Sequence, residues 1–112
     1  MNEDIKSEEK TNLPKEVIEA KKQGAVLELT GEDGEVFFFR PPGKIDMNRY
    51  LSAAAKGKLA NAVQNLVFDL AVYPDSEVLK GRLEKKPGLM VALSNALQNA
   101  VGLNEEFEVK KL

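Results

Sequence analysis

The sequence predicts an α+β domain in which an N-terminal β-hairpin packs on a small bundle of about four helices. Residues 25–30 and 36–40 are rich in β-branched, leucine and aromatic residues and flank a Gly-Glu-Asp-Gly stretch, a pattern typical of a hairpin. After residue 46, apolar residues recur at helical spacing in four successive segments. Glycine or proline separates these segments, which predicts tight connections between helices.

Length and composition favour one globular domain. The chain has 112 residues, of which 43% are hydrophobic and 30% charged, proportions typical of an ordered protein with one core. Residues 1–12 carry little apolar content besides Ile5 and are predicted to form a flexible acidic tail. Residues 13–112 are then expected to form a single α+β domain.

A short helix is expected before the hairpin, from residue 15 to residue 23. Pro14 suits the start of a helix and Gly24 suits its end. The apolar face of this segment is thin, since it consists mainly of Leu13, Val17 and Ile18. Its stability should therefore depend on docking against the rest of the domain.

The hairpin raises a question about its second strand. Asp33-Gly34 favours a primed turn between the strands. Three consecutive phenylalanines, 37–39, cannot all face one side of a strand, because side chains alternate. Either both faces of this strand are covered, which is the commoner arrangement, or at least one ring is exposed.

The helices are expected at four places. Asp46 is expected to cap a helix over residues 47–55, which Gly57 ends, and a second helix is expected over 58–72. Pro74 ends the second helix, and Asp75 or Ser76 caps a short third one. Pro87 suits the first turn of a fourth helix, which ends at Gly102. Residues 106–110 are expected to be a short strand or a frayed tail.

The residue types present argue against an enzyme. The chain contains no cysteine and no histidine, so the commonest nucleophile, general base and metal ligands are missing. No phosphate-binding glycine loop, dinucleotide fingerprint or metal-spaced acidic cluster occurs. We therefore expect no catalytic site, no cofactor and no metal.

Charge and hydropathy argue against nucleic acid and membranes as partners. The formal net charge is −2, and nucleic-acid binding needs a basic footprint. The densest basic run, residues 80–86, lacks interleaved aromatics and is expected to be a solvated helix face. No apolar run is long enough to span a bilayer, and the polar start is unlike a signal peptide. The cytoplasm is therefore the expected compartment.

Phe68 and Val72 are candidates for contact with another protein. Both lie on the side of the predicted second helix opposite its main apolar stripe. The hairpin or another helix covers them, or they are exposed and carry binding energy. Segments 59–67 and 93–101 match at six of nine positions, and this likeness places six amides on non-core faces: Asn61, Gln64, Asn65, Asn95, Gln98 and Asn99.

Over roughly residues 25–112, the sequence resembles a family of small tail assembly chaperones of phages and prophages. The residues that carry the resemblance are Phe39-Arg40-Pro41, Met47, Arg49-Tyr50-Leu51, Leu66-Val67, Pro74-Asp75, Leu79, Leu83, Pro87-Gly88-Leu89, Asn95 and Gly102-Leu103. The helix before the hairpin and the double proline at 41–42 depart from the family pattern. The resemblance implies a protein that binds the tape measure protein and keeps it soluble until tail-tube subunits assemble around it.

The expected mechanism is capture of a partner's amphipathic helix in an apolar groove. The candidate partner contacts are Phe68, Val72, Phe37 and Phe39, with Arg40 and Arg49 as polar anchors. Three alternatives stay open: a small structural component of a phage tail or virion, a nucleic-acid-binding regulator, and, last, an enzyme. Weak self-association also stays open.

Overall fold

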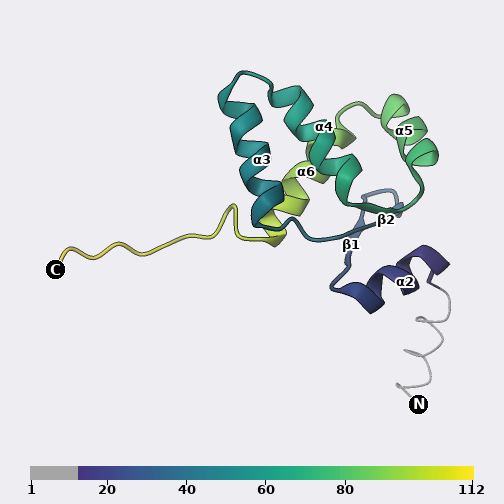
Figure 1. The fold of residues 1–112 in the computed structure, drawn as a ribbon, viewed down its shortest axis with the longest axis horizontal. Coiled ribbons are helices and arrows are strands. Elements are labelled where there is room, and N and C mark those ends of the chain that lie inside the picture. Colours follow the sequence, from purple (N-terminus) through teal and green to yellow (C-terminus); the bar gives the residue numbers. More distant parts are fainter. Residues whose placement is uncertain (1–12) are drawn as a thin grey trace, which may run out of the picture.

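A computed structural model describes residues 13–112 of the chain. The described part has an α+β fold, and the predicted hairpin on a helix bundle is confirmed (Figure 1). The flexible tail predicted for residues 1–12 lies outside the described residues. In chain order the elements are α2 (Lys15–Gln23), β1 (Leu27–Thr30), β2 (Val36–Phe39), α3 (Lys44–Ala55), α4 (Leu59–Leu70), β3 (Ala71–Tyr73), α5 (Ser76–Lys85) and α6 (Leu89–Ala100).

The sheet is antiparallel, with strand order β1-β2-β3. Leu27 lies opposite Phe39 across the hairpin, and Phe39 lies opposite Ala71 in β3. The predicted helix over 58–72 is wrong at its end, because α4 stops at Leu70 and Ala71 takes an extended conformation. There the backbone N–H of Arg40 donates to the Leu70 carbonyl at 2.8 Å. Residues 71–73 therefore pair with the hairpin as a strand and do not extend α4 by another turn.

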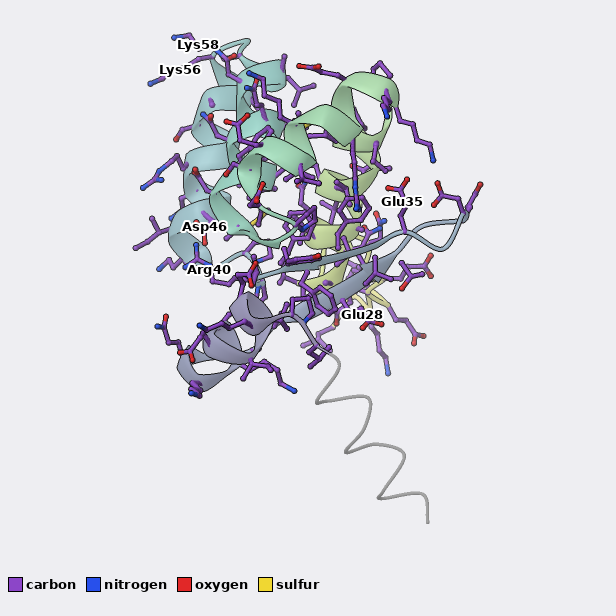
Figure 2. The ribbon with its side chains drawn as sticks, turned by 90° about the vertical axis from the view of Figure 1, so that its right-hand side faces the viewer. Glu28, Glu35, Arg40, Asp46, Lys56 and Lys58 are labelled. Carbon is purple, nitrogen blue, oxygen red and sulfur yellow. The ribbon has the colours of Figure 1, made fainter. Side chains whose placement is uncertain are left out.

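Both faces of β2 are covered, which resolves the question raised by its three phenylalanines. Phe37 and Phe39 are buried against α4, α5 and α6, on one side of the sheet. Phe38 faces the other side, where it shares a small hollow with Val17 of α2. Figures 1 and 2 show α2 on the opposite side of the sheet from the four later helices. The core that joins these elements comprises Phe37, Phe39, Leu66, Val67, Leu70, Leu79, Leu83, Leu93 and Leu97.

The hairpin loop is longer than a primed two-residue turn. The N–H of Gly34 donates to the Gly31 carbonyl at 3.0 Å, and the N–H of Gly31 donates to the Glu35 carbonyl at 2.7 Å. Gly34 has φ = 87°, whereas no non-glycine residue in the described chain has a positive φ. Either primed turn, type I′ or II′, would require a positive φ at Asp33, so the predicted primed turn is wrong. Glycine is still needed at position 34.

Helix boundaries differ slightly from those predicted. α3 begins three residues earlier than expected, and Asp46 lies inside its first turn, where its carboxylate accepts from the N–H of Gly43 at 2.8 Å. Asp75 caps α5 by accepting from the N–H of Val78 at 3.0 Å. α6 begins after Pro87 rather than with it. Residues 106–110 form neither helix nor strand and are exposed.

A polar pair is buried in α6. Ser94 and Gln98 are only 1% and 4% exposed, and the Gln98 side-chain amide donates to Ser94 Oγ at 3.0 Å. The prediction that Gln98 lies on a non-core face is therefore wrong, while the other five amides are exposed as predicted. The two side chains lie one helical turn apart and form a hydrogen bond with each other, so the inner face of α6 can include polar groups.

Cover on both faces of β2 makes Phe38 a test of the fold. We expect Phe38→Ala to lower the free energy of unfolding by about 3–5 kcal/mol, as for other buried phenylalanines. Leu51→Ala, at a position that is 58% exposed, should change it by only about 0.5 kcal/mol. Urea unfolding followed by circular dichroism measures both. A Phe38→Ala variant as stable as Leu51→Ala would show that α2 does not cover this face.

Candidate protein-binding site

A surface groove lies between α4, α5 and the start of α6. Its volume is about 320 Å³, at the lower end of the range of ligand-binding clefts. Four apolar side chains line it: Phe68, Leu83, Pro87 and Met90. The polar side chains of Gln64, Lys80 and Glu84 complete its wall. We call this feature the Phe68 groove.

Phe68 has a place between core and surface. It packs against the buried cluster yet remains partly exposed, as does Met90. The stripe on α4 that includes Leu66, Val67 and Leu70 faces the sheet and α6. Phe68 therefore lies at the border of that stripe, where its ring is accessible from the groove. The sequence pattern predicted Phe68 on the side opposite the stripe, whereas the structure packs it against the core at the border of the stripe.

The Phe68 groove has an apolar floor and a charged rim. Leu83 is buried at 6% exposure, whereas Pro87, Lys80 and Glu84 are exposed. Lys80 and Glu84 are one turn apart on α5 and carry opposite charges. An amphipathic helix presents apolar residues on one face with charged residues beside them, so this arrangement is chemically complementary to such a segment.

The other predicted contact residues do not line the groove. Phe37 and Phe39 are 1% and 0% exposed, so the hypothesis that they contact a partner is corrected: in this fold they belong to the core. Val72 is half-buried in β3. The two phenylalanines cannot serve as exposed aromatic contacts, because α4, α5 and α6 cover the face of β2 on which they lie.

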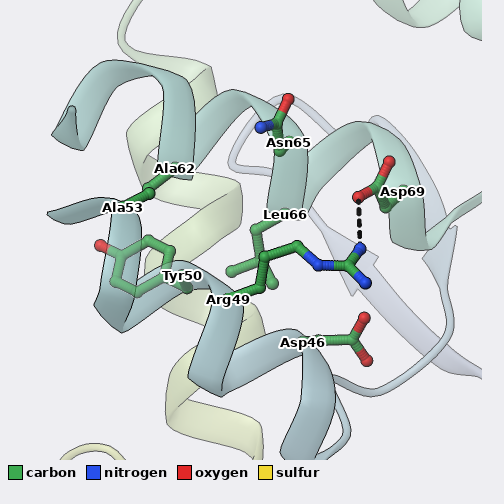
Figure 3. A pocket seen from close by; sticks show the side chains of 8 residues that line it. All are labelled: Asp46, Arg49, Tyr50, Ala53, Ala62, Asn65, Leu66 and Asp69. Atoms are coloured by element: carbon green, nitrogen blue, oxygen red, sulfur yellow. Dashed lines mark ion pairs between the residues drawn. The ribbon is translucent and has the colours of Figure 1, made fainter.

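Arg40 and Arg49 both have partners within the chain. Arg40 Nη2 donates to the Asp69 carbonyl at 2.7 Å, and Arg49 Nη1 lies 4.0 Å from Asp69 Oδ2 (Figure 3). Both side chains remain exposed. The positive charges lie at the C-terminal end of α4, where the helix dipole favours them. These arginines thus stabilise the end of the helix that carries Phe68.

A shallow pocket beside Arg49 is separate from the Phe68 groove. Figure 3 shows it between α3 and α4, with Asp46, Tyr50 and Asn65 among its lining residues. Its volume is about 30 Å³, roughly the space of one water molecule. The two pockets share no lining residue. The six predicted contacts therefore do not form one site, and Phe68 alone lies in the larger groove.

Sequence reasoning missed most of the groove residues, although a signal for them existed. Lys80, Leu83, Glu84 and Pro87 follow the spacing i, i+3, i+4, i+7, and Gln64 and Phe68 are one turn apart. Lys80, Leu83 and Glu84 share one face of α5, which Pro87 follows, and Gln64 and Phe68 share one face of α4. What the sequence does not contain is the packing of α4 beside α5, which brings the two faces together.

An ionic cluster fixes the hairpin loop to the end of α5. Lys86 donates a hydrogen bond to the Asp33 carboxylate, and Arg82 Nη1 lies 3.7 Å from Glu35 Oε2. The Arg82 guanidinium also lies over the Phe37 ring, 5.4 Å from its centroid. The basic run on α5, predicted to be only a solvated face, thus partly contacts the hairpin.

The cluster changes the pKa values of its members. The hydrogen bond from Lys86, followed by that from the Glu35 N–H at 3.1 Å, lowers the pKa of Asp33 to about 2. The same contact raises the pKa of Lys86. Through these contacts the cluster connects α5, which forms one wall of the Phe68 groove, to the hairpin loop of the sheet.

Two comparisons place the chain among known proteins. Residues 20–110 match the family described as Domain of unknown function (DUF6848). The chain belongs to this family. A solved structure, that of the uncharacterised protein rbstp2171 from Bacillus stearothermophilus, is 28% identical, with a TM-score of 0.71 over 84% of this chain and 99% of that one. A comparison with curated proteins gave no match.

Two further features of residues 13–112 concern metals and membranes. Among these residues, no group of three or more aspartate or glutamate side chains is placed to hold a metal ion. The helices in this part of the chain are too short or too polar to cross a bilayer.

The ionic cluster generates a pH prediction. Because the pKa of Asp33 in the folded chain is below its ordinary value of 3.8, its stabilising effect is present above that value and is lost as the pH falls through about 2. We expect Asp33→Asn to lower the melting temperature at pH 6, with the difference from wild type closing towards pH 2. Glu108→Gln, on an exposed segment, is the control. An equal difference at both pH values would contradict the cluster's role.

Proposed function

We propose that this protein is a non-enzymatic binding module whose Phe68 groove holds one face of a partner's amphipathic helix. The observation that carries the proposal is the groove itself, in which a partly exposed aromatic ring stands among Leu83, Pro87 and Met90. Partly exposed aromatic residues in such a setting tend to dominate binding energy. The recognition would follow the helix-in-groove mode, with anchors spaced at i, i+3 or i+4, and i+7.

The proposed partner is the tape measure protein of a phage tail. Its support is the resemblance of residues 25–112 to tail assembly chaperones, together with a groove suited to helical segments. A tape measure protein is long, helical and rich in apolar residues, so it needs its apolar faces covered before the tail tube forms. The proposed role is to cover them in the bacterial cytoplasm during virion assembly.

A structural component of a phage tail or virion is the alternative role. Such a protein would self-associate and remain in the finished particle, whereas a chaperone would be absent from it. Mass spectrometry of purified particles distinguishes the two. Detection of the chain in stoichiometric amounts would contradict the chaperone role.

Affinity capture from phage- or prophage-induced source cells tests the partner. The tagged chain should recover a long helical tape-measure-like protein, and that protein should precipitate when expressed without this chain. Recovery of capsid or tube subunits instead, or of this chain alone, would contradict the proposed partner.

Substitutions in the groove test its part in binding. Phe68→Glu should weaken binding of the captured partner by about 2 kcal/mol, roughly 30-fold, as expected for an aromatic hot spot. Because Phe68 also packs on the core, Pro87→Glu provides a second variant at an exposed groove position. Both are measured by calorimetric titration.

The matched control is Leu51→Glu, an exposed apolar position on α3 outside the groove. It should bind like the wild type. Circular dichroism confirms that each variant is folded. Folded Phe68→Glu and Pro87→Glu variants that bind as tightly as Leu51→Glu would contradict the proposal.

A further inference from the structure

One edge of the sheet has an apolar hollow beside it. Among residues 13–112, β1 pairs with β2 alone, so half of its backbone polar groups face away from the sheet. Next to β1 lies a hollow of about 130 Å³ against α6. Leu29, Gly31 and Phe37 line it from the sheet, and Leu89, Ala92 and Ala96 from the helix. A strand added to β1 would place alternate side chains over this hollow.

Residues 106–110 have the pattern of such a strand. The segment is exposed throughout and forms no regular structure. Phe107 and Val109 are 79% and 92% exposed, and they alternate with Glu106, Glu108 and Lys110. This period of two is typical of a strand with one buried face and one solvated face.

The segment fits β1 in one antiparallel register. If Lys110 lies opposite Glu28, then Val109 lies beside Leu29, on the core side of the sheet. Phe107 then lies opposite Gly31, at the hollow. Glu28 is exposed and projects from the side of the sheet on which α2 lies (Figure 2), so the Lys110 charge would find an opposite charge there.

A parallel strand cannot both place Phe107 at the hollow and avoid a like charge beside Glu28. With Phe107 and Val109 on the core side at Leu27 and Leu29, it places a glutamate next to Glu28, and like charges side by side are destabilising. Shifting the parallel strand to bring Lys110 beside Glu28 moves Phe107 away from the hollow. Charge and apolar pattern together therefore select the antiparallel register.

We propose that residues 106–110 of one copy pair with β1 of a second copy, forming a reciprocal dimer. The turn after α6 directs the segment away from its own sheet (Figure 1). Hydrogen bonds hold this turn: the N–H of Leu103 donates to the Gln98 carbonyl at 3.0 Å, and that of Glu105 to the Gly102 carbonyl at 3.1 Å. In a two-fold dimer, the segment of each copy pairs with the outer edge of β1 in the other copy. The surface is separate from the Phe68 groove, so either proposal can fail without the other.

Cysteine cross-linking tests the register, because the chain has no native cysteine. Opposite residues of an antiparallel pair have Cα atoms about 4.5–5.5 Å apart, within the range of a disulfide. A mixture of Glu28→Cys and Lys110→Cys chains should form a cross-linked heterodimer under mild oxidation. A mixture of Glu28→Cys and Glu106→Cys chains, which is out of register on the same face, should lose this product.

Analytical ultracentrifugation of chains without cysteine completes the test. The wild type should show a concentration-dependent dimer that Phe107→Glu abolishes, while Glu106→Gln retains it. A monomer at all concentrations, or equal cross-linking in both mixtures, would overturn the proposal. So would a Glu28→Cys/Lys110→Cys double variant that forms only an intramolecular disulfide, because the segment would then pair within its own chain.

Discussion

The rest of the structure depends on burial of the three phenylalanines of β2 on two faces. Phe37 and Phe39 require an apolar cover on one side, and α4, α5 and α6 provide it together. Phe38 requires another cover on the opposite side, which explains why a helix with so thin an apolar face precedes the hairpin. A hairpin alone is only marginally stable in water. Here it becomes the middle layer between α2 and the helix bundle.

This constraint also produces the candidate site. α4 and α5 both contribute to the core on the same face of β2, with Val67 and Leu79 fully buried there, and a groove remains between the two helices. Phe68, next to Val67, is then directed to the boundary between them. The ion pairs of α5 with the hairpin and the hydrogen bond from Arg40 to the Asp69 carbonyl at the end of α4 hold the two walls. The groove is thus a consequence of how the sheet is covered.

Local sequence signals predicted much of the fold. Pro14 and Gly24 marked both ends of α2 correctly, and helical spacing located α3 to α6. The failures have a common cause. β3 looked helical because Ala71 and Val72 continue the apolar pattern of α4, and only pairing with β2 makes them a strand. Gln98 looked exposed because glutamine usually lies on a protein surface, and only the packing of α6 buries it together with Ser94, its partner one turn away. For the site, one predicted contact of six lines the groove, because grooves form between elements distant in the sequence.

The central claim is that a helical partner occupies the Phe68 groove. The methionines allow a direct measurement, since Met90 lines the groove while Met47 lies on α3 outside it. Methyl-labelled methionine NMR, during titration with helical peptides from the captured tape measure protein, reports on both positions at once. The account predicts that the Met90 methyl signal shifts while that of Met47 stays unchanged. A shift of Met47 with Met90 unchanged, or no shift of either signal while binding occurs, would contradict it.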